Sequence, residues 1–146
     1  MTRKHFLQLT NYDQTMRRAN IQIVEDHDAV RLLLGITFKR QFNVVTKRDG
    51  LEGLAWLAAG NFPDLIILDM QMPRLNGIGF MRQLRSSGMF NQIPVLLVSG
   101  NNDVEENTEL FDLGIVDFVS KPFDPTSLYE KVRKIVSLNE KQLSAV

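Results

Sequence analysis

The sequence predicts a single α/β domain, a five-stranded parallel sheet with helices on both faces, built from five consecutive β/α units. Short apolar runs alternate with stretches of helical period from Ile21 onward. Two of these runs, 65–68 and 95–98, are apolar at every position, which is typical of parallel strands covered on both faces. The chain has 146 residues, 44% of them apolar, which suits one domain with one core. Right-handed crossovers then place the helices in two layers, the doubly wound arrangement.

The expected strands are short runs rich in branched and aromatic residues. Each is followed by polar residues or by a turn residue, where the next helical stretch begins. The five runs are Ile21–Val24, Phe42–Val45, Leu65–Leu68, Val95–Val98 and Asp117–Val119. Because every strand is separated from the next by a helical stretch, the strands are expected to be parallel.

The first two helices are expected from apolar residues that recur every three to four positions. The first has Asp28 as its expected N-cap. Its residues expected to face the sheet are Val30, Leu33, Leu34, Thr37 and Phe38. The second spans 51–59 and stops at Gly60, which is free to take the left-handed conformation that ends many helices. Its expected inward residues are Leu51, Leu54, Ala55 and Ala58.

The other three helices are expected from the signals at their ends. The third spans 76–86 and the fourth spans 103–114. The fourth opens on Asp103 and Glu106, which have the spacing of a capping box. The last opens on Asp124-Pro125, an N-cap followed by proline at the first helical position. Its residues expected to face inward are Leu128, Val132, Ile135 and Val136.

Composition excludes several classes of function. The 17 basic residues balance the 17 acidic ones, so we expect no nucleic-acid partner. The chain has no cysteine, and no apolar run approaches the roughly 18 residues of a membrane span. We therefore expect a cytoplasmic protein that does not bind membranes. The pattern divides the chain into an N-terminal tail at 1–19, expected to be mobile or an extra helix, a domain at 20–138 and a C-terminal tail at 139–146.

Polar residues follow four of the five expected strands. In an open α/β sheet, ligands bind beyond the carboxyl ends of the strands. The residues at these ends are Glu25 and Asp26, Asp69, Ser99, and Lys121. Three carboxylates repel one another unless a cation neutralises them, and Mg²⁺ binds carboxylate oxygens and commonly shares its site with phosphate. A lysine and a hydroxyl suit phosphoryl oxygens, so we expect this edge to accept a phosphoryl group on an acid.

Four stretches of the chain carry a family resemblance. They are Ile23–Asp26 (IVED), Leu68–Gly77 (LDMQMPRLNG), Val98–Gly100 (VSG) and Val119–Phe123 (VSKPF). Over about residues 20–138, the chain resembles a response-regulator receiver domain of two-component signalling, of the single-domain chemotaxis type. The resemblance implies a flavodoxin-like fold and a phosphoprotein that takes its phosphoryl group from a histidine kinase or a histidine phosphotransfer protein. It also implies a protein that is no enzyme, beyond assisting its own phosphorylation and dephosphorylation.

The resemblance also implies roles for individual residues at the sheet edge. Asp69 matches the phosphoacceptor. The implied magnesium ligands are Glu25, Asp26, Asp69 and the backbone carbonyl of Gln71. Glu25 stands where the family more often has aspartate, and the longer side chain is expected to shift metal binding without abolishing it. Ser99 and Lys121 match the residues that contact the phosphoryl group.

The remaining implied roles concern switching. Ser99 and Phe118 match the switch positions, and Phe118 lacks the hydroxyl of the more frequent tyrosine, so its switch would work through ring packing alone. Gln71 and Asn101 match positions that tune how long the phosphoryl group lasts. Lys121-Pro122 matches a cis peptide bond, which proline makes accessible. The output would be a changed surface on the fourth helix, fifth strand and fifth helix of a monomer or weak dimer, offered to a downstream protein.

Three other interpretations stay open. A flavodoxin-like cofactor binder shares the architecture but needs a neutral loop after the first strand, whereas 25–28 (EDHD) is acidic. A phosphatase with an aspartate nucleophile needs a second carboxylate two residues after Asp69, where Gln71 stands. A phosphorylation-independent pseudo-receiver, serving as an interaction module, keeps the fold and loses the switch. The acidic residues between 102 and 120 form either a solvated face or a partner surface.

Overall fold

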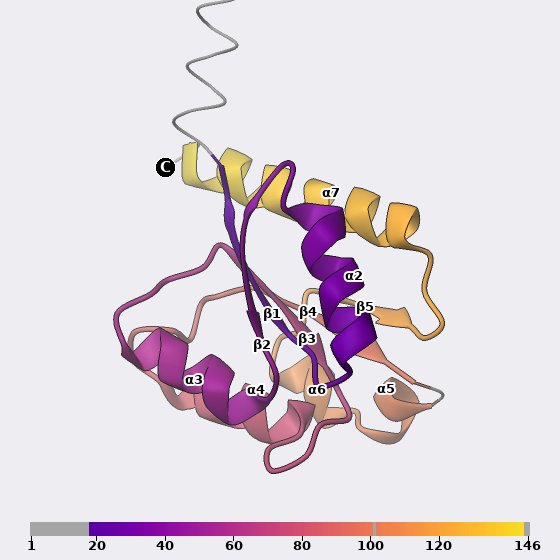
Figure 1. The fold of residues 1–146 in the computed structure, drawn as a ribbon. Helices are drawn as coiled ribbons and strands as arrows, with labels where there is room; N and C mark the ends of the chain where they lie inside the picture. Colours follow the sequence, from indigo (N-terminus) through magenta and orange to yellow (C-terminus); the bar gives the residue numbers. More distant parts are fainter. Residues whose placement is uncertain (1–17, 101, 145–146) are drawn as a thin grey trace, which may run out of the picture.

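The computed structural model describes residues 18–100 and 102–144, and in them a five-stranded parallel sheet (Figure 1). The strands are β1 (Asn20–Val24), β2 (Asn43–Lys47), β3 (Leu65–Asp69), β4 (Val95–Ser99) and β5 (Asp117–Ser120). Their order is β2-β1-β3-β4-β5, and every neighbouring pair is parallel. The chain changes direction across the sheet between β1 and β3, which is the topological switch point where such folds bind ligands. The predicted fold class is confirmed.

Helices cover both faces of the sheet (Figure 1). They are α2 (Asp28–Phe38), α3 (Gly50–Ala58), α4 (Gly77–Ser86), α5 (Asp103–Glu106), α6 (Glu109–Asp112) and α7 (Pro125–Ser144). One core cluster joins α2 and α7 to the sheet, and the other joins α3, α4, α5 and α6 to it. Successive residues of β3 alternate between them, since Ile66 and Leu68 belong to one cluster and Leu65 and Ile67 to the other. No helix within the described ranges is long and apolar enough to cross a membrane.

Several helix ends lie where the sequence predicts them. Asn76 caps α4, and its side chain accepts a hydrogen bond from the Gly79 amide at 2.9 Å. Asp124 does the same for α7, accepting from the Ser127 amide at 3.2 Å. Gly60 has a φ of 105°, the positive value expected for a helix-ending glycine. The helix α7 extends to Ser144, so residues 139–144 of the expected C-terminal tail continue it.

The start of α2 differs from the prediction. The N-cap is His27, whose ring Nδ1 accepts a hydrogen bond from the Val30 amide at 3.4 Å. Asp28 is instead the first helical residue and pairs with Arg31 at 2.6 Å, one turn further along. Of the expected stripe, Leu33 is 44% exposed, because the buried face of α2 is narrower than the apolar pattern.

The inward face of α3 was predicted correctly only at Leu54, which is partly buried and packs against the core. The residues Leu51, Ala55 and Ala58 are exposed, whereas Gly50, Gly53 and Leu57 are buried. The helix lies so close to the sheet that a Cβ added to Gly53 would be only 3.1 Å from the side chain of Val24. Because the backbone of α3 lies so close to the sheet, its buried face includes glycines. A search for apolar side chains at helical spacing does not identify these positions.

The expected fourth helix is interrupted. It consists of two short helices, α5 and α6, separated at Asn107, whose φ of −127° and ψ of 69° are not helical. The side chain of Asn107 donates to the Asp103 carbonyl at 2.7 Å and so replaces a backbone amide there. Asp103 forms no capping box, because its carboxylate accepts from the Gly100 amide instead. Gly114 ends the segment with a φ of 78°, as expected.

Candidate functional site

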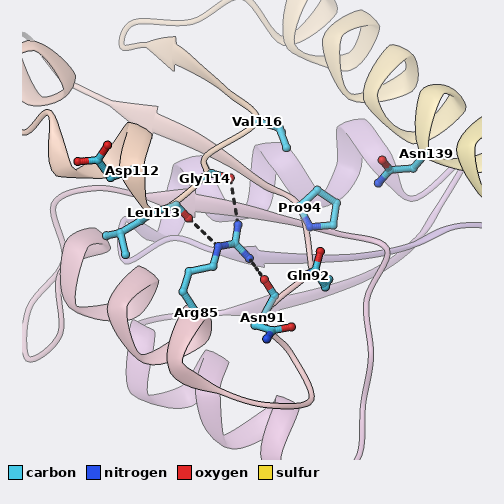
Figure 2. Close-up of a pocket in the computed structure, with 9 residues that line it drawn as sticks. All are labelled: Arg85, Asn91, Gln92, Pro94, Asp112, Leu113, Gly114, Val116 and Asn139. Carbon is cyan, nitrogen blue, oxygen red and sulfur yellow. Dashed lines mark hydrogen bonds between the residues drawn. The ribbon is translucent and has the colours of Figure 1, made fainter.

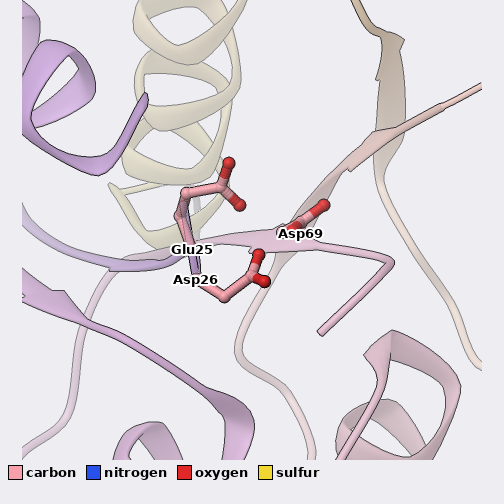
Figure 3. Close-up of side chains that lie close together, drawn as sticks. All are labelled: Glu25, Asp26 and Asp69. Atoms are coloured by element: carbon pink, nitrogen blue, oxygen red, sulfur yellow. The ribbon is translucent and has the colours of Figure 1, made fainter. Parts of the chain in front are cut away.

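Three carboxylates meet at the carboxyl end of the sheet (Figure 3). Asp69 is the last residue of β3, and Glu25 and Asp26 directly follow β1. The two strands are paired with Val24 opposite Leu68, so their ends lie side by side. One oxygen from each of the three carboxylates lies within 4.8 Å of the others. Glu25 and Asp69 are only 2% and 3% exposed, whereas Asp26 faces solvent.

Lys121 reaches this cluster from the end of β5. Its Nζ lies 3.0 Å from Asp69 Oδ1 and 3.2 Å from Glu25 Oε1, so one ammonium bridges two carboxylates. Its backbone amide donates to the Ser99 carbonyl at 2.7 Å, which extends the β4–β5 pairing to the lysine. The Lys121-Pro122 peptide bond is cis, as the resemblance implies. The sheet therefore brings together four charged residues from three distant parts of the chain, at 25–26, 69 and 121.

The electrostatics of the cluster are strained at neutral pH. Burial raises the pKa of Asp69 from 3.8 to about 6, and the neighbouring Glu25 carboxylate adds to this rise. Burial and the proximity of Asp69 also raise the pKa of Asp26. Burial disfavours the charged form of Lys121, but Asp69 and Glu25 outweigh it, so the pKa of the ammonium is raised. One lysine thus does not neutralise the three acids.

Two buried oxygens in the cluster have no hydrogen-bond partner. They are Glu25 Oε2 and Asp69 Oδ2. Unpartnered buried carboxylate oxygens are costly, and such groups are usually paired or bound to a metal. Hard divalent cations such as Mg²⁺ prefer carboxylate oxygens, so the donor set fits a magnesium ion.

The other predicted site residues lie around this cluster. Ser99 is the buried last residue of β4, one position beyond Val98, which pairs with Asp69. The backbone amide of Gln71 faces Asp69 Oδ1 at 3.4 Å, so the backbone two residues after the aspartate turns back over it. Phe118 on β5 is 36% exposed and packs edge-on against Phe111. Asn101 lies outside the described residues, as does the 1–17 part of the predicted tail.

Two contributors were not predicted. Arg31 on α2 donates to the backbone carbonyls of Glu25 and Asp26 at 3.0 and 3.4 Å, and so steadies the acidic loop. Its spacing of three residues from Asp28 on a predicted helix is the signal that could have revealed it. Asp103 accepts a hydrogen bond from the Gln71 side chain at 3.1 Å across 32 residues of sequence, and no local pattern predicts that contact.

A hollow lies at the amino ends of β4 and β5 and does not involve the acidic cluster (Figure 2). Its volume is about 420 Å³, and it is bordered by Arg85, by the segment before β4 and by the turn before β5. Arg85 donates to four backbone carbonyls, those of Leu113, Asn91, Ile93 and Gly114. The guanidinium is thus satisfied by the protein itself, and the buried side-chain atoms without a partner in the described part of the chain do not include any that line this hollow.

The comparisons with known proteins agree with this geometry. The family model described as "Response regulator receiver domain" matches residues 21–133. The chain belongs to this family. The receiver is 36% identical to the response regulator MprA of Mycobacterium sp. (strain KMS) over 118 residues, which are 80% of the chain and 50% of MprA. It is 31% identical to hybrid signal transduction histidine kinase D of Dictyostelium discoideum over 140 residues, 96% of the chain but 9% of that kinase.

Solved structures show the same fold. The chemotaxis response regulator CheY4 of Vibrio cholerae is similar with a TM-score of 0.75 and 27% identity, covering 82% of the chain and 99% of CheY4. The signal receiver domain of a histidine kinase from Syntrophus aciditrophicus has a TM-score of 0.73 and 28% identity, covering 82% of the chain and 90% of that domain. The chain spans about half the length of MprA and is a phosphoacceptor receiver of two-component signalling. These matches do not favour the pseudo-receiver interpretation.

Proposed function

We propose that Asp69 is the phosphoacceptor of this receiver. Asp69, like Glu25, is buried and contacts Lys121. The supporting observation that distinguishes Asp69 is its place at the end of β3, within the 68–77 stretch that carries the family resemblance. A carboxylate oxygen of Asp69 would attack the phosphorus of a phosphohistidine in line. The phosphorus–nitrogen bond breaks as the phosphorus–oxygen bond forms, and its electron pair returns to the imidazole, which then takes up a proton. The product is an aspartyl phosphate.

The residues around Asp69 divide the binding of the phosphoryl group. Glu25, Asp26, Asp69 and the backbone carbonyl of Gln71 would hold Mg²⁺, which when bound supplies positive charge next to the transferred oxygens. Lys121, already within reach of Asp69, would hold another phosphoryl oxygen with its ammonium. Ser99, at the end of the neighbouring strand, would donate its hydroxyl once the group is in place.

The phosphoryl donor is a phosphohistidine on a histidine kinase or a histidine phosphotransfer protein. The support is the family membership and the similarity to a hybrid histidine kinase. A cytoplasmic location is part of the proposal, because such donors carry their phosphoryl groups in the cytoplasm. The receiver assists its own phosphorylation and dephosphorylation and performs no other turnover.

Phosphate labelling tests the acceptor and the metal together. With radiolabelled acetyl phosphate and Mg²⁺, we expect one phosphoryl group on the wild-type chain and none on Asp69→Asn. Chelating the Mg²⁺ should reduce the labelling of the wild-type chain at least tenfold. The matched control is Asp112→Asn, an exposed aspartate on α6 that should label normally. Equal labelling of Asp69→Asn and the wild-type chain would refute the assignment.

Phosphorylation would change the surface formed by α5, α6, β5 and α7. Ser99 would move toward the phosphoryl group, and Phe118, which is partly exposed and packs against Phe111, would turn inward behind it. The part of this surface formed by α5, α6 and β5 is acidic, because residues 102–120 include no lysine or arginine. Glu109 is held by both nitrogens of an Arg82 fork, so its charge serves the contact between α4 and α6. Asp112 is exposed, which makes it the better residue with which to test a downstream partner with basic side chains.

Charge reversal at Asp112 tests this surface. The probe is a synthetic amphipathic peptide with lysines on one side of its helix and leucines on the other. Phosphorylated receiver should bind it more tightly than unphosphorylated receiver, and Asp112→Lys should weaken binding by about threefold to tenfold because a favourable charge pair becomes a repulsive one. Glu52→Lys on α3 is the control, since Glu52 pairs with the exposed Arg48 and lies outside this surface. Identical affinities for the wild-type and Asp112→Lys receivers in fluorescence titrations would contradict the proposal.

A further inference from the structure

The carboxylate of Asp103 joins two loops at the edge where the acidic cluster lies. Its Oδ1 accepts a hydrogen bond from Gln71 Nε2 at 3.1 Å, in the loop between β3 and α4. Its Oδ2 accepts from the Gly100 amide at 3.1 Å, in the loop after β4. Both oxygens are therefore used, one for each loop, and we call this pair of contacts the Asp103 bridge.

The bridge links the loop after β3, the strand that carries the acceptor, to the loop after the neighbouring strand β4. Asp69 ends β3 and pairs with Val98 of β4, so the loops that follow these strands border the Asp69 carboxylate. Gln71 is two residues from Asp69, and its backbone amide faces Asp69 Oδ1. The side chain of Gln71, though exposed, is tied to Asp103 on the other side of this border.

The bridge also connects the acceptor to the switching segment. Asp103 is the first residue of α5, and its carbonyl accepts from the Asn107 side chain that ends this short helix. A change in the position of Gln71 or Gly100 would therefore be transmitted to both ends of α5.

We propose that Asp103 is a positioning residue that holds the Gln71 carboxamide across the border of the acceptor site and thereby prolongs the life of the phosphoryl group. The inference rests on the proposed function of Asp69. Hydrolysis requires a water oxygen to bond to phosphorus while the bond between phosphorus and the Asp69 oxygen breaks. The electrons of that bond return to the carboxylate, and the protons of the water leave with inorganic phosphate. When Asp103 holds the Gln71 carboxamide in place, the carboxamide narrows the path by which this water reaches the phosphorus. Without the Asp103 contact, the carboxamide can move away and leave the path open.

The experiment follows the loss of label from phosphorylated receivers. Chains labelled with radioactive acetyl phosphate are transferred to unlabelled buffer with Mg²⁺, and the remaining label is measured over time. Asp103→Ala should take up label normally and lose it about fivefold faster, the change expected from one hydrogen bond of ordinary strength. Asp103→Asn should be intermediate, because its oxygen replaces only one of the two carboxylate oxygens and its NH2 group, a donor, faces the other loop's donor. The matched control is Glu105→Ala, an exposed acid in the same helix.

A double variant shows whether Asp103 acts through Gln71. The combination of Asp103→Ala with Gln71→Ala should lose label at the rate of Gln71→Ala alone, which a general loosening of the fold would not produce. Thermal unfolding of each variant separates that loosening from the effect on lifetime. Normal labelling with an unchanged lifetime in both Asp103 variants would overturn the bridge and leave Asp69 as the acceptor, and so would effects that multiply in the double variant. A wild-type chain that takes up no label would overturn the proposed function itself.

Discussion

The two edges of the sheet bury charge in opposite ways. At the carboxyl end, Glu25 and Asp69 each keep one buried oxygen without a hydrogen-bond partner, and burial raises the pKa of Asp69 to about 6. At the amino end, Arg85 is also partly buried, yet its guanidinium donates to four backbone carbonyls. Figure 2 shows those of Asn91, Leu113 and Gly114. The first arrangement is incomplete without an added cation, and the second is complete. A charge that the protein satisfies serves the fold, and one that it leaves unsatisfied indicates a ligand.

The completeness of the Arg85 site explains its structural importance. The carbonyls that it holds belong to the segment before β4 and to the turn before β5, and Arg85 itself lies near the end of α4. Burial lowers the pKa of this guanidinium, but an arginine stays charged throughout the ordinary pH range. The guanidinium of Arg85 thus supplies hydrogen-bond donors to carbonyls of both segments.

Removal of this cation is the largest effect that we expect. Arg85→Ala should lower the free energy of unfolding by about 2–3 kcal/mol, because carbonyls that are partly buried lose their donor. Urea unfolding monitored by circular dichroism measures this change. The matched control is Arg133→Ala, which removes an arginine from an exposed pair with Glu130 and should cost less than about 0.5 kcal/mol. Equal effects of the two substitutions would show that the carbonyl contacts are not what makes Arg85 important.

The sequence predicted the acidic cluster better than some of the fold around it. The ends of parallel strands lie at one edge, so the positions of Glu25, Asp69 and Lys121 follow once the strands are recognised. The family resemblance then implied the same residues independently. The distances between these side chains cannot be predicted from the sequence in this way, because Lys121 contacts Asp69 across 52 residues of sequence.

The failures have physical causes that a pattern of apolar residues does not contain. The buried face of α3 includes Gly53, which is selected by the closeness of the backbone to Val24 and not by hydrophobicity. The interruption between α5 and α6 depends on whether the Asn107 side chain bonds to the backbone, and asparagine is also found inside helices. The Asp103 bridge depends on a partner in another loop.

A smaller change in stability is expected at the acidic cluster, which lacks a neutralising cation when Mg²⁺ is absent. Without Mg²⁺ at pH 7.5, Asp69→Asn should raise the free energy of unfolding by about 1 kcal/mol, because it removes one of the crowded carboxylates while also losing the contact with Lys121. The substitution that abolishes labelling is thus expected to stabilise the fold. Removal of a carboxylate should raise the free energy of unfolding where acids repel one another in the absence of their ligand. At a structural ion pair such as Arg74–Asp49, the same removal should lower it.

The pH dependence of the free energy of unfolding tests independently whether the charge of Asp69 destabilises the fold. The pKa of Asp69 is about 6 in the folded chain and ordinarily 3.8, so the folded state binds the proton more tightly. The free energy of unfolding of the wild-type chain in chelator should therefore increase as the pH falls through about 6, and this gain should be complete below about pH 4. Asp26, whose pKa is also raised, adds to the same increase. Urea unfolding at several pH values should show a smaller increase for Asp69→Asn, and parallel profiles for the two chains would mean that Asp69 is not the strained group.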